Sequence, residues 1–133
     1  MAIDYGDART GIAVSDEMNM LVGDAFTLTE WNPEAVAERI VSEAKARGVK
    51  RLVLGLPKNM DGTEGPRAEK CREFAERLRG LTDIELVLWD ERRSSIEAHA
   101  ILHANGKKEK KHRKTVDAVA ASLILEGYLG TMR

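Results

Sequence analysis

Cysteine, aromatic residues and long apolar runs are all scarce in this sequence of 133 residues. The single cysteine, Cys71, excludes an internal disulfide bond. Aromatic residues make up 5% of the chain, so stacking of unpaired bases on a platform of rings is not expected as the main mode of binding. No stretch approaches the ~20 apolar residues of a membrane span or has the layout of a signal peptide. We therefore expect a cytoplasmic protein without membrane contact.

A strong excess of charge of either sign is missing as well. The net charge is −1 although 32% of the residues are charged, so any contact with nucleic acid has to come from a local basic patch. A chain of this length can bury one core, whereas two domains of half the length would each be marginal. The sequence therefore predicts one domain over residues 1–133.

The hydrophobic pattern predicts three strands, then helix, strand, helix and strand in turn, and finally two helices. Asn32, Pro33 and Glu34 form a helix start, with a capping side chain, a proline in the first turn and an acid near the positive helix end. Ser94 and Glu97 match a capping box that opens a later helix. The strands are expected at 1–6, 10–15, 21–28, 51–57 and 84–89, and the last helix at 116–129.

This order of elements predicts an α/β fold with a five-stranded mixed sheet and helices on both faces. The first three strands form an antiparallel meander, and right-handed crossovers place the strands at 51–57 and 84–89 parallel to the first one. The continuous apolar run at 51–57 is typical of a parallel strand covered on both faces. The carboxyl ends of the three parallel strands then meet at one edge, where α/β sheets carry their ligand sites.

Three acidic residues from distant parts of the sequence are expected near that edge. Asp4 ends the first strand, Glu91 follows the last one, and Asp117 opens the last helix. Carboxylate oxygens suit Mg²⁺ or Mn²⁺, and two such ions about 4 Å apart stabilise the attacking and the leaving oxygen when a phosphodiester is hydrolysed. The three acids therefore predict a nuclease centre in which Asp4 bridges two ions while Glu91 and Asp117 each complete one of them.

Each acid also has a simpler interpretation. Asp4 suits a turn, Glu91 suits a surface ion pair with a neighbouring arginine, and Asp117 suits a helix start. On a helical wheel, however, Asp117 falls inside the apolar arc of the last helix, where an unpaired carboxylate is costly. Asp90 competes with Glu91 for the metal, because adjacent strand residues point to opposite faces. The longer side chain of glutamate favours Glu91, and Asp90 is expected to anchor the loop or a neighbouring arginine.

Five motifs spaced along nearly the whole chain carry a family resemblance. They are Ala2-Ile3-Asp4-Tyr5-Gly6 with Arg9, Gly11-Ile12-Ala13-Val14-Ser15-Asp16, Leu54-Gly55-Leu56-Pro57 with Asp61-Gly62-Thr63, Asp90-Glu91-Arg92 with Ser94, Ser95 and Ala98, and Asp117-Ala118-Val119-Ala120-Ala121 with Ile124-Leu125. In this order they resemble the YqgF family, also called RuvX, although that family usually has threonines in place of the two serines. The resemblance implies an RNase H-like fold related to Holliday junction resolvases. It also implies a nuclease that matures the 5′ end of pre-16S rRNA in ribosome biogenesis, with catalytic acids at Asp4, Glu91 and Asp117.

A basic run precedes the last helix. Its six cationic residues are Lys107, Lys108, Lys110, Lys111, Arg113 and Lys114. Charge runs are usually solvated and mobile, but beside the expected ions this one would hold a phosphate backbone without regard to sequence. Arg9, Lys58 and Arg92 are expected at the same edge as further phosphate contacts.

The residues alone leave the substrate and the oligomeric state open. The resemblance favours structured RNA, namely an rRNA precursor. The alternative is a four-way DNA junction, whose resolution would require a homodimer presenting two sites. The sequence does not decide between a monomer and a homodimer. A non-catalytic assembly factor that binds nucleic acid is a third interpretation, because the same acids would also hold a structural metal ion.

Overall fold

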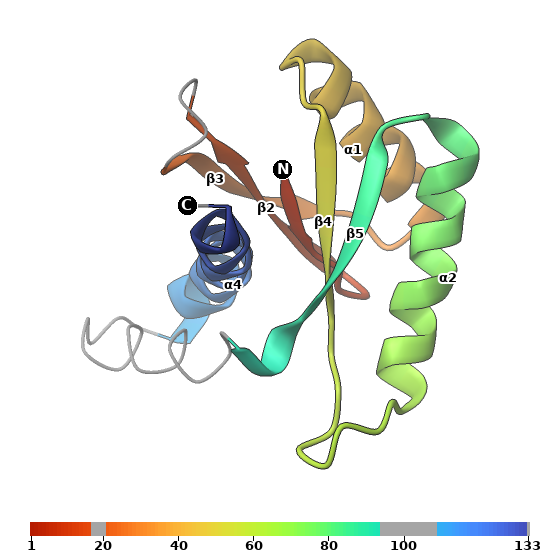
Figure 1. Cartoon of the computed structure of the whole chain (residues 1–133), viewed down its shortest axis with the longest axis vertical. Coiled ribbons are helices and arrows are strands. Elements are labelled where there is room, and N and C mark those ends of the chain that lie inside the picture. Colours follow the sequence, from red (N-terminus) through yellow and green to blue (C-terminus); the bar gives the residue numbers. More distant parts are fainter. Residues whose placement is uncertain (17–20, 94–108, 133) are drawn as a thin grey trace.

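The computed structural model describes residues 1–16, 21–93 and 109–132 (Figure 1). Its strands are β1 (Ala2–Asp4), β2 (Arg9–Ser15), β3 (Val22–Thr29), β4 (Arg51–Leu56) and β5 (Glu85–Asp90). Its helices are α1 (Pro33–Ala46), α2 (Pro66–Leu81), α4 (Glu109–Thr131) and a short 3₁₀ helix, η1 (Glu91–Arg93). The expected strands are therefore confirmed, with small differences at their ends.

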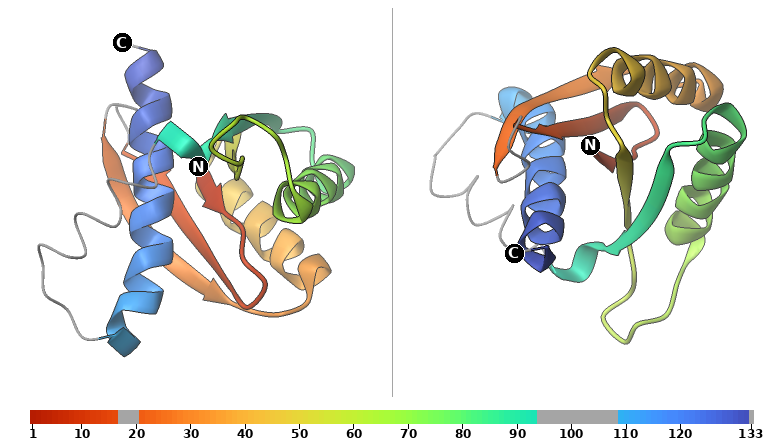
Figure 2. Two further views of the ribbon diagram at one scale, coloured as in Figure 1. Left: turned by 90° about the horizontal axis from the view of Figure 1, so that it is seen from below. Right: turned by 45° about the horizontal axis from the view of Figure 1, so that its top comes forward.

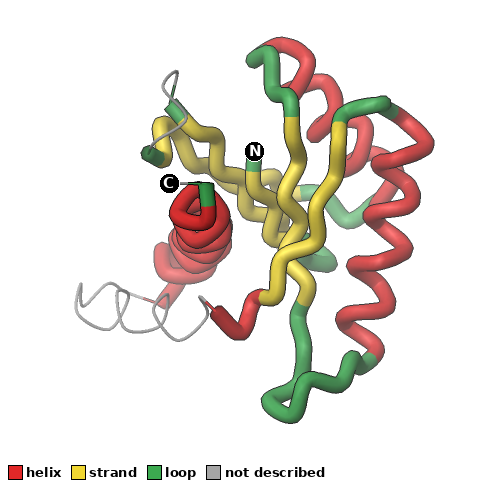
Figure 3. Tube along the Cα trace, in the orientation of Figure 1, coloured by secondary structure: helices red, strands yellow, loops and turns green. Residues whose placement is uncertain are grey.

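The five strands form one sheet in the order β3-β2-β1-β4-β5. Strands β1, β2 and β3 pair antiparallel, whereas β4 is parallel to both β1 and β5. This arrangement confirms the predicted mixed sheet with a meander and two crossovers. Because β1, β4 and β5 run in one direction, their carboxyl ends lie at the same edge of the sheet (Figure 3).

Helices cover both faces of the sheet. Figure 2 shows α1 and α2 on one face and α4 on the other. One buried cluster joins Ile3 and Leu54 to α1 and α2, and a second joins Ala2 and Val53 to α4. Successive strand residues point to opposite faces, so Asp4 shares the α4 face with Ala2, while Tyr5 faces α2 and stacks on Phe74 with ring centroids 4.0 Å apart.

The residues at the two ends of α1 have the capping and terminating roles that the sequence predicts. The side chain of Asn32 accepts hydrogen bonds from the backbone amides of Glu34 at 2.9 Å and Ala35 at 3.4 Å. Pro33 occupies the first turn, where its missing amide hydrogen leaves no bond unmade. Beyond the other end, Gly48 has a φ of 68°, a left-handed conformation that glycine adopts without strain.

The start of the last helix is where the sequence expectation is wrong. Helix α4 begins at Glu109 rather than at residue 116, so Asp117 lies well inside the helix and does not open it. The expected helix at Ser94 and Glu97 lies outside the described residues. Among the described residues, no helix is both long enough and apolar enough to cross a membrane.

Candidate active site

Asp4 and Glu91 meet although a strand separates the elements that carry them. Asp4 ends β1, and Glu91 opens η1 directly after β5. Their carboxyl groups are hydrogen-bonded to each other. The contact crosses β4 at Gly55, because a Cβ atom built on Gly55 would overlap Oε1 of Glu91. The carboxylate of Glu91 therefore lies directly on the backbone of β4, in space that only a glycine leaves open.

Burial and charge make Asp4 an unusual carboxyl group. Its pKa is raised from 3.8 to about 8, first by burial and then by the charge and the hydrogen bond of Glu91. The guanidinium of Arg67 opposes this rise in the pKa. Near neutral pH, the carboxyl group of Asp4 consequently keeps its proton.

Asp117 approaches Asp4 from the other side, across β2. Gly11 pairs with Asp4 in the sheet, and a Cβ atom on Gly11 would overlap the carbonyl oxygen of Asp117. The side chain of Asp117 is 21% exposed and accepts a hydrogen bond of 3.3 Å from Nε of Arg9. Its pKa is raised to about 6, mainly by burial and then by the charge of Asp4, while Arg9 lowers it. Asp117 thus faces the sheet, as the helical wheel predicts.

The three acids fit a hard divalent cation by chemistry and by charge. All of their donor atoms are carboxylate oxygens, and Asp4 interacts with both other acids. In the part of the chain that the structure describes, no three acidic, histidine or cysteine side chains are already gathered around one point. The contacts explain this, because Glu91 is hydrogen-bonded to Asp4 whereas Asp117 is turned to Arg9. A bound cation would supply the positive charge that the proton of Asp4 and the guanidinium of Arg9 supply beside these acids.

The simpler interpretation of Asp117 does not hold. Asp117 is not a helix-start acid, since α4 begins at Glu109. The ion pair at the end of β5 is made by Asp90, whose Oδ2 lies 2.6 Å from Nη2 of Arg92. Asp90 therefore anchors an arginine, as expected, and Glu91 is the residue that reaches Asp4.

The expected phosphate contacts are spread over this edge of the molecule. Arg9 is engaged with Asp117, and Arg92 with Asp90 and, at 3.5 Å, with the carbonyl oxygen of Met60. Lys58 follows β4 and is close enough to lower the pKa of both Glu64 and Asp90. In the basic run, Lys107 and Lys108 lie outside the described residues, while the backbone of Lys110, Lys111, Arg113 and Lys114 belongs to α4.

Three residues of the site were missed by the sequence analysis. Gly11 and Gly55 let the other two acids approach Asp4, and glycine inside a strand is a known signal for such close contact. Arg67, at the start of α2, donates to the carbonyl oxygen of Tyr5 at 2.6 Å and lowers the pKa of Asp4. No local pattern marks Arg67, because its place depends on how α2 packs against the turn after β1.

The strand order and the helices on both faces of the sheet are those of an RNase H-like fold. The fold is similar to that of "T. thermophilus RuvC in complex with Holliday junction substrate", with a TM-score of 0.60 and 12% identity over 97% of this chain and 94% of that chain. At this identity the likeness concerns the fold alone.

The sequence comparisons define the family more narrowly. A family model described as "RuvX: Holliday junction resolvase" matches residues 1–131. The chain is 41% identical over 129 residues to the "Putative pre-16S rRNA nuclease" of Halothermothrix orenii, covering 97% of this chain and 92% of the relative. It is 39% identical over 131 residues to the protein of the same name from Bacillus mycoides, covering 97% and 96%. The chain therefore belongs to the RuvX family, as its five motifs indicate.

Proposed function

We propose that the protein is a metal-dependent nuclease that processes the 5′ end of a 16S rRNA precursor. The observation that carries this proposal is the buried carboxyl group of Asp4, hydrogen-bonded to Glu91 on one side and close to Asp117 on the other. Buried carboxyl groups that repel one another lower the stability of a fold unless a cation joins them. The names of the relatives from Halothermothrix orenii and Bacillus mycoides support the choice of substrate.

Asp4, Glu91 and Asp117 are the residues that would hold two Mg²⁺ or Mn²⁺ ions. When bound, such ions neutralise the charge that develops on the oxygens of a phosphodiester during hydrolysis. For this purpose Asp4 has to give up its proton. Arg9 and Arg67 remain beside the acids as the positive groups that orient the phosphate.

The same site on a different substrate would resolve DNA junctions. A junction has two strands to cut, so resolution requires two sites in a homodimer, whereas processing of one RNA end is possible for a monomer. We propose RNA as the substrate and the cytoplasm, where ribosomes are assembled, as the place of action.

The test compares three substrates under two conditions. Purified protein is incubated with a 16S precursor fragment that carries its 5′ extension, with the corresponding mature fragment and with a four-way DNA junction, each with Mn²⁺ or with chelator. We expect cleavage of the precursor alone, and only with Mn²⁺. Cleavage of the junction instead of the precursor would identify branched DNA as the substrate. Binding without cleavage of any substrate would identify a non-catalytic assembly factor.

A further inference from the structure

A hollow of about 460 Å³ lies across the sheet from the three acids. It is formed by the turn after β1, the start of α1 and one side of α2, with Tyr5, Asp7, Trp31, Lys70, Phe74 and Arg77 among its lining residues. The hollow and the acids adjoin the same turn, because Asp4 and Arg9 belong to the site while Tyr5 and Asp7 line the hollow. A polymer bound at the acids therefore has a short path to it.

Trp31 gives the hollow a free aromatic surface. Its side chain is 72% exposed, and every other aromatic residue in the described part of the chain is buried or half-buried. The stacked rings of Tyr5 and Phe74 lie in the same hollow. An exposed indole ring offers a face on which a nucleobase of any sequence can stack.

A basic stripe on α2 leads from the acids to this ring. Arg67, Lys70 and Arg77 recur with Phe74 at spacings of three and four residues, so they share one side of the helix. Arg67 lies close enough to Asp4 to lower its pKa, whereas Lys70 and Arg77 line the hollow with Trp31. From Arg67 to Arg77 the helix rises by about 15 Å, which is the length of a few nucleotides.

The acidic residues that line the hollow do not fully offset the positive charge of the basic stripe on α2. Asp7 lies 3.1 Å from Nη1 of Arg67 and 3.6 Å from Nζ of Lys70 and is thereby neutralised. Glu73 is the other acid among the lining residues. The three cations of the stripe outnumber these two acids, so a polyanion gains from binding along it.

We propose that Trp31 and the stripe Arg67–Lys70–Arg77 bind the single-stranded RNA that flanks the cleaved bond, with one unpaired base stacked on Trp31. This assignment rests on the nuclease function proposed above. It specifies where a single-stranded part of the RNA substrate binds. A larger hollow of about 570 Å³, between Lys45 and the end of α2, suits such a ligand less well because no aromatic residue lines it.

The experiment uses tryptophan fluorescence, since Trp31 and Trp89 are the two tryptophans of the chain and Trp89 is only 7% exposed. Oligouridylate of about 12 nucleotides is titrated into the protein with chelator present, so that binding is measured without cleavage. We expect the oligonucleotide to quench the fluorescence of the parent and to leave that of Trp31→Phe unchanged. Trp31→Phe keeps a ring and should retain most of the affinity, whereas Trp31→Ala should bind on the order of tenfold more weakly.

Charge variants test the stripe in the same assay over a salt series. Lys70→Gln and Arg77→Gln should each reduce the slope of log affinity against log salt by about 0.7, the value for one phosphate bound on a single strand. Arg39→Gln, which removes an exposed cation of α1 outside the hollow, is the control and should leave the slope unchanged.

Each outcome decides the assignment. Equal affinity of parent and Trp31→Ala, or unaltered slopes for both charge variants, would overturn it and leave the nuclease proposal standing. Absence of any binding of oligouridylate would also overturn it. The nuclease function is tested separately, by the cleavage assay on the rRNA precursor.

Discussion

Nε of Arg9 lies 3.3 Å from Oδ2 of Asp117, which joins the start of β2 to a helix more than a hundred residues further along the chain. The two side chains are 36% and 21% exposed, so solvent screens the pair only in part. The ion pair offsets some of the repulsion between Asp117 and Asp4, but the pKa of Asp117 is still raised to about 6. Near neutral pH, the charge on Asp117 therefore opposes folding.

The first prediction follows from this balance. In metal-free protein, Asp117→Asn should melt at the same temperature as the parent or a few degrees higher, because the substitution removes a disfavoured charge and keeps an oxygen that accepts from Arg9. Thermal melting with chelator near neutral pH measures this. A drop of many degrees would mean that Asp117 mainly holds α4 on the sheet.

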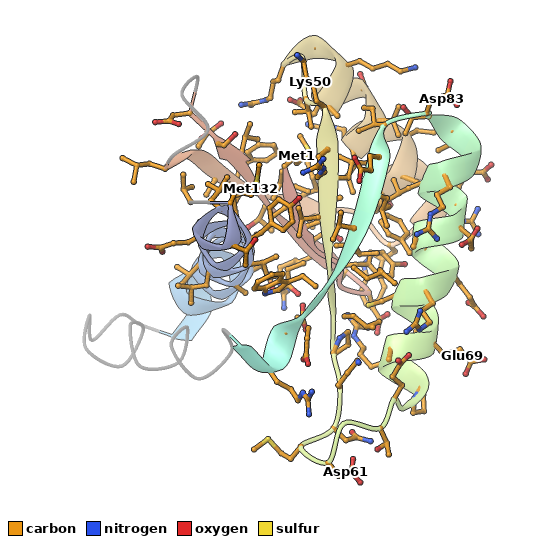
Figure 4. The ribbon with its side chains drawn as sticks, viewed as in Figure 1. Met1, Lys50, Asp61, Glu69, Asp83 and Met132 are labelled. Atoms are coloured by element: carbon orange, nitrogen blue, oxygen red, sulfur yellow. The ribbon has the colours of Figure 1, made fainter. Side chains whose placement is uncertain are left out.

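The second prediction concerns Asp4. The variant Asp4→Asn should fold and lose cleavage by more than ~100-fold, since the substitution removes a carboxylate that would hold the metal ions. Asp83→Asn is a matched control, because Asp83 is exposed and lies at the far end of α2 from Glu69 (Figure 4). A folded Asp4→Asn protein that cleaves at the parent rate would end the nuclease proposal.

The third prediction tests the space above Gly55. In Gly55→Ala the new methyl group would overlap Oε1 of Glu91 and lie 2.7 Å from Cδ1 of Ile124, both of them ends of flexible side chains. The fold should survive while Glu91 is displaced from Asp4, which lowers cleavage by roughly 10- to 100-fold.

Two controls separate this displacement from a general loss of stability. Gly80→Ala, in the last turn of α2 with nothing within 4 Å of the new methyl group, should leave cleavage unchanged. In a Glu91→Gln background, Gly55→Ala should add no further loss, because the group that it displaces no longer binds metal. Independent, additive losses would contradict the proposed role of Gly55.

The fourth prediction is a pH dependence of stability. The pKa of Asp4 is raised from 3.8 in the unfolded chain to about 8 in the folded one. In the folded state Asp4 therefore stays protonated to a higher pH than in the unfolded state. Stability should therefore fall as the pH rises through this range, by on the order of 5 °C or more in melting temperature. The measurement is a series of melting curves of metal-free protein, and Mn²⁺ should reverse the trend.

The variant Asp4→Asn isolates the contribution of Asp4 to that profile. The buried amino group of Met1 acts in the opposite direction, because its pKa is lowered from 8.0 to about 6 and stability from this group rises with pH between those values. The contribution of Met1 is common to both proteins. A profile of Asp4→Asn that is as steep as that of the parent would contradict the raised pKa of Asp4.

The fifth prediction concerns the basic run. Changing Lys107, Lys108, Lys110 and Lys111 to alanine should weaken binding of unrelated sequences alike and flatten the salt dependence, by about 0.9 in slope for each duplex phosphate that the variant no longer binds. Cleavage at saturating substrate should persist, because these lysines hold no metal. If the quadruple variant and the parent give identical slopes, binding lies with other cations, such as Lys58 and Arg92.

The sequence predicts the strands and α1 because their signals are local. Asn32 and Gly48 mark the ends of α1, and the apolar run at 51–57 marks a strand that is buried on both faces. The start of α4 is missed for a physical reason. The apolar periodicity begins near residue 116, whereas α4 begins at Glu109, in a lysine-rich sequence, and lysine has a high intrinsic helix propensity.

The sequence predicts the three acids of the candidate site, but it does not predict the residues that surround them. Asp4, Glu91 and Asp117 follow from the strand ends and the motifs, and their interactions depend on β-strand register. Gly11 lies opposite Asp4 because of the pairing of β1 with β2, and the path of Glu91 over Gly55 requires the place of β5 beside β4. Such relations arise only when the sheet has formed, so a single sequence does not display them.

Helix α4 packs on one face of the sheet, mainly against β1, β2 and β3, and also carries Asp117. During synthesis the chain leaves the ribosome from its amino end, and this helix follows all five strands. A nascent chain that already contains Asp4 and Glu91 has neither the third acid nor a cover for Ala2 and Val53 until α4 emerges. The docking of one late helix therefore closes the core and assembles the site in the same event.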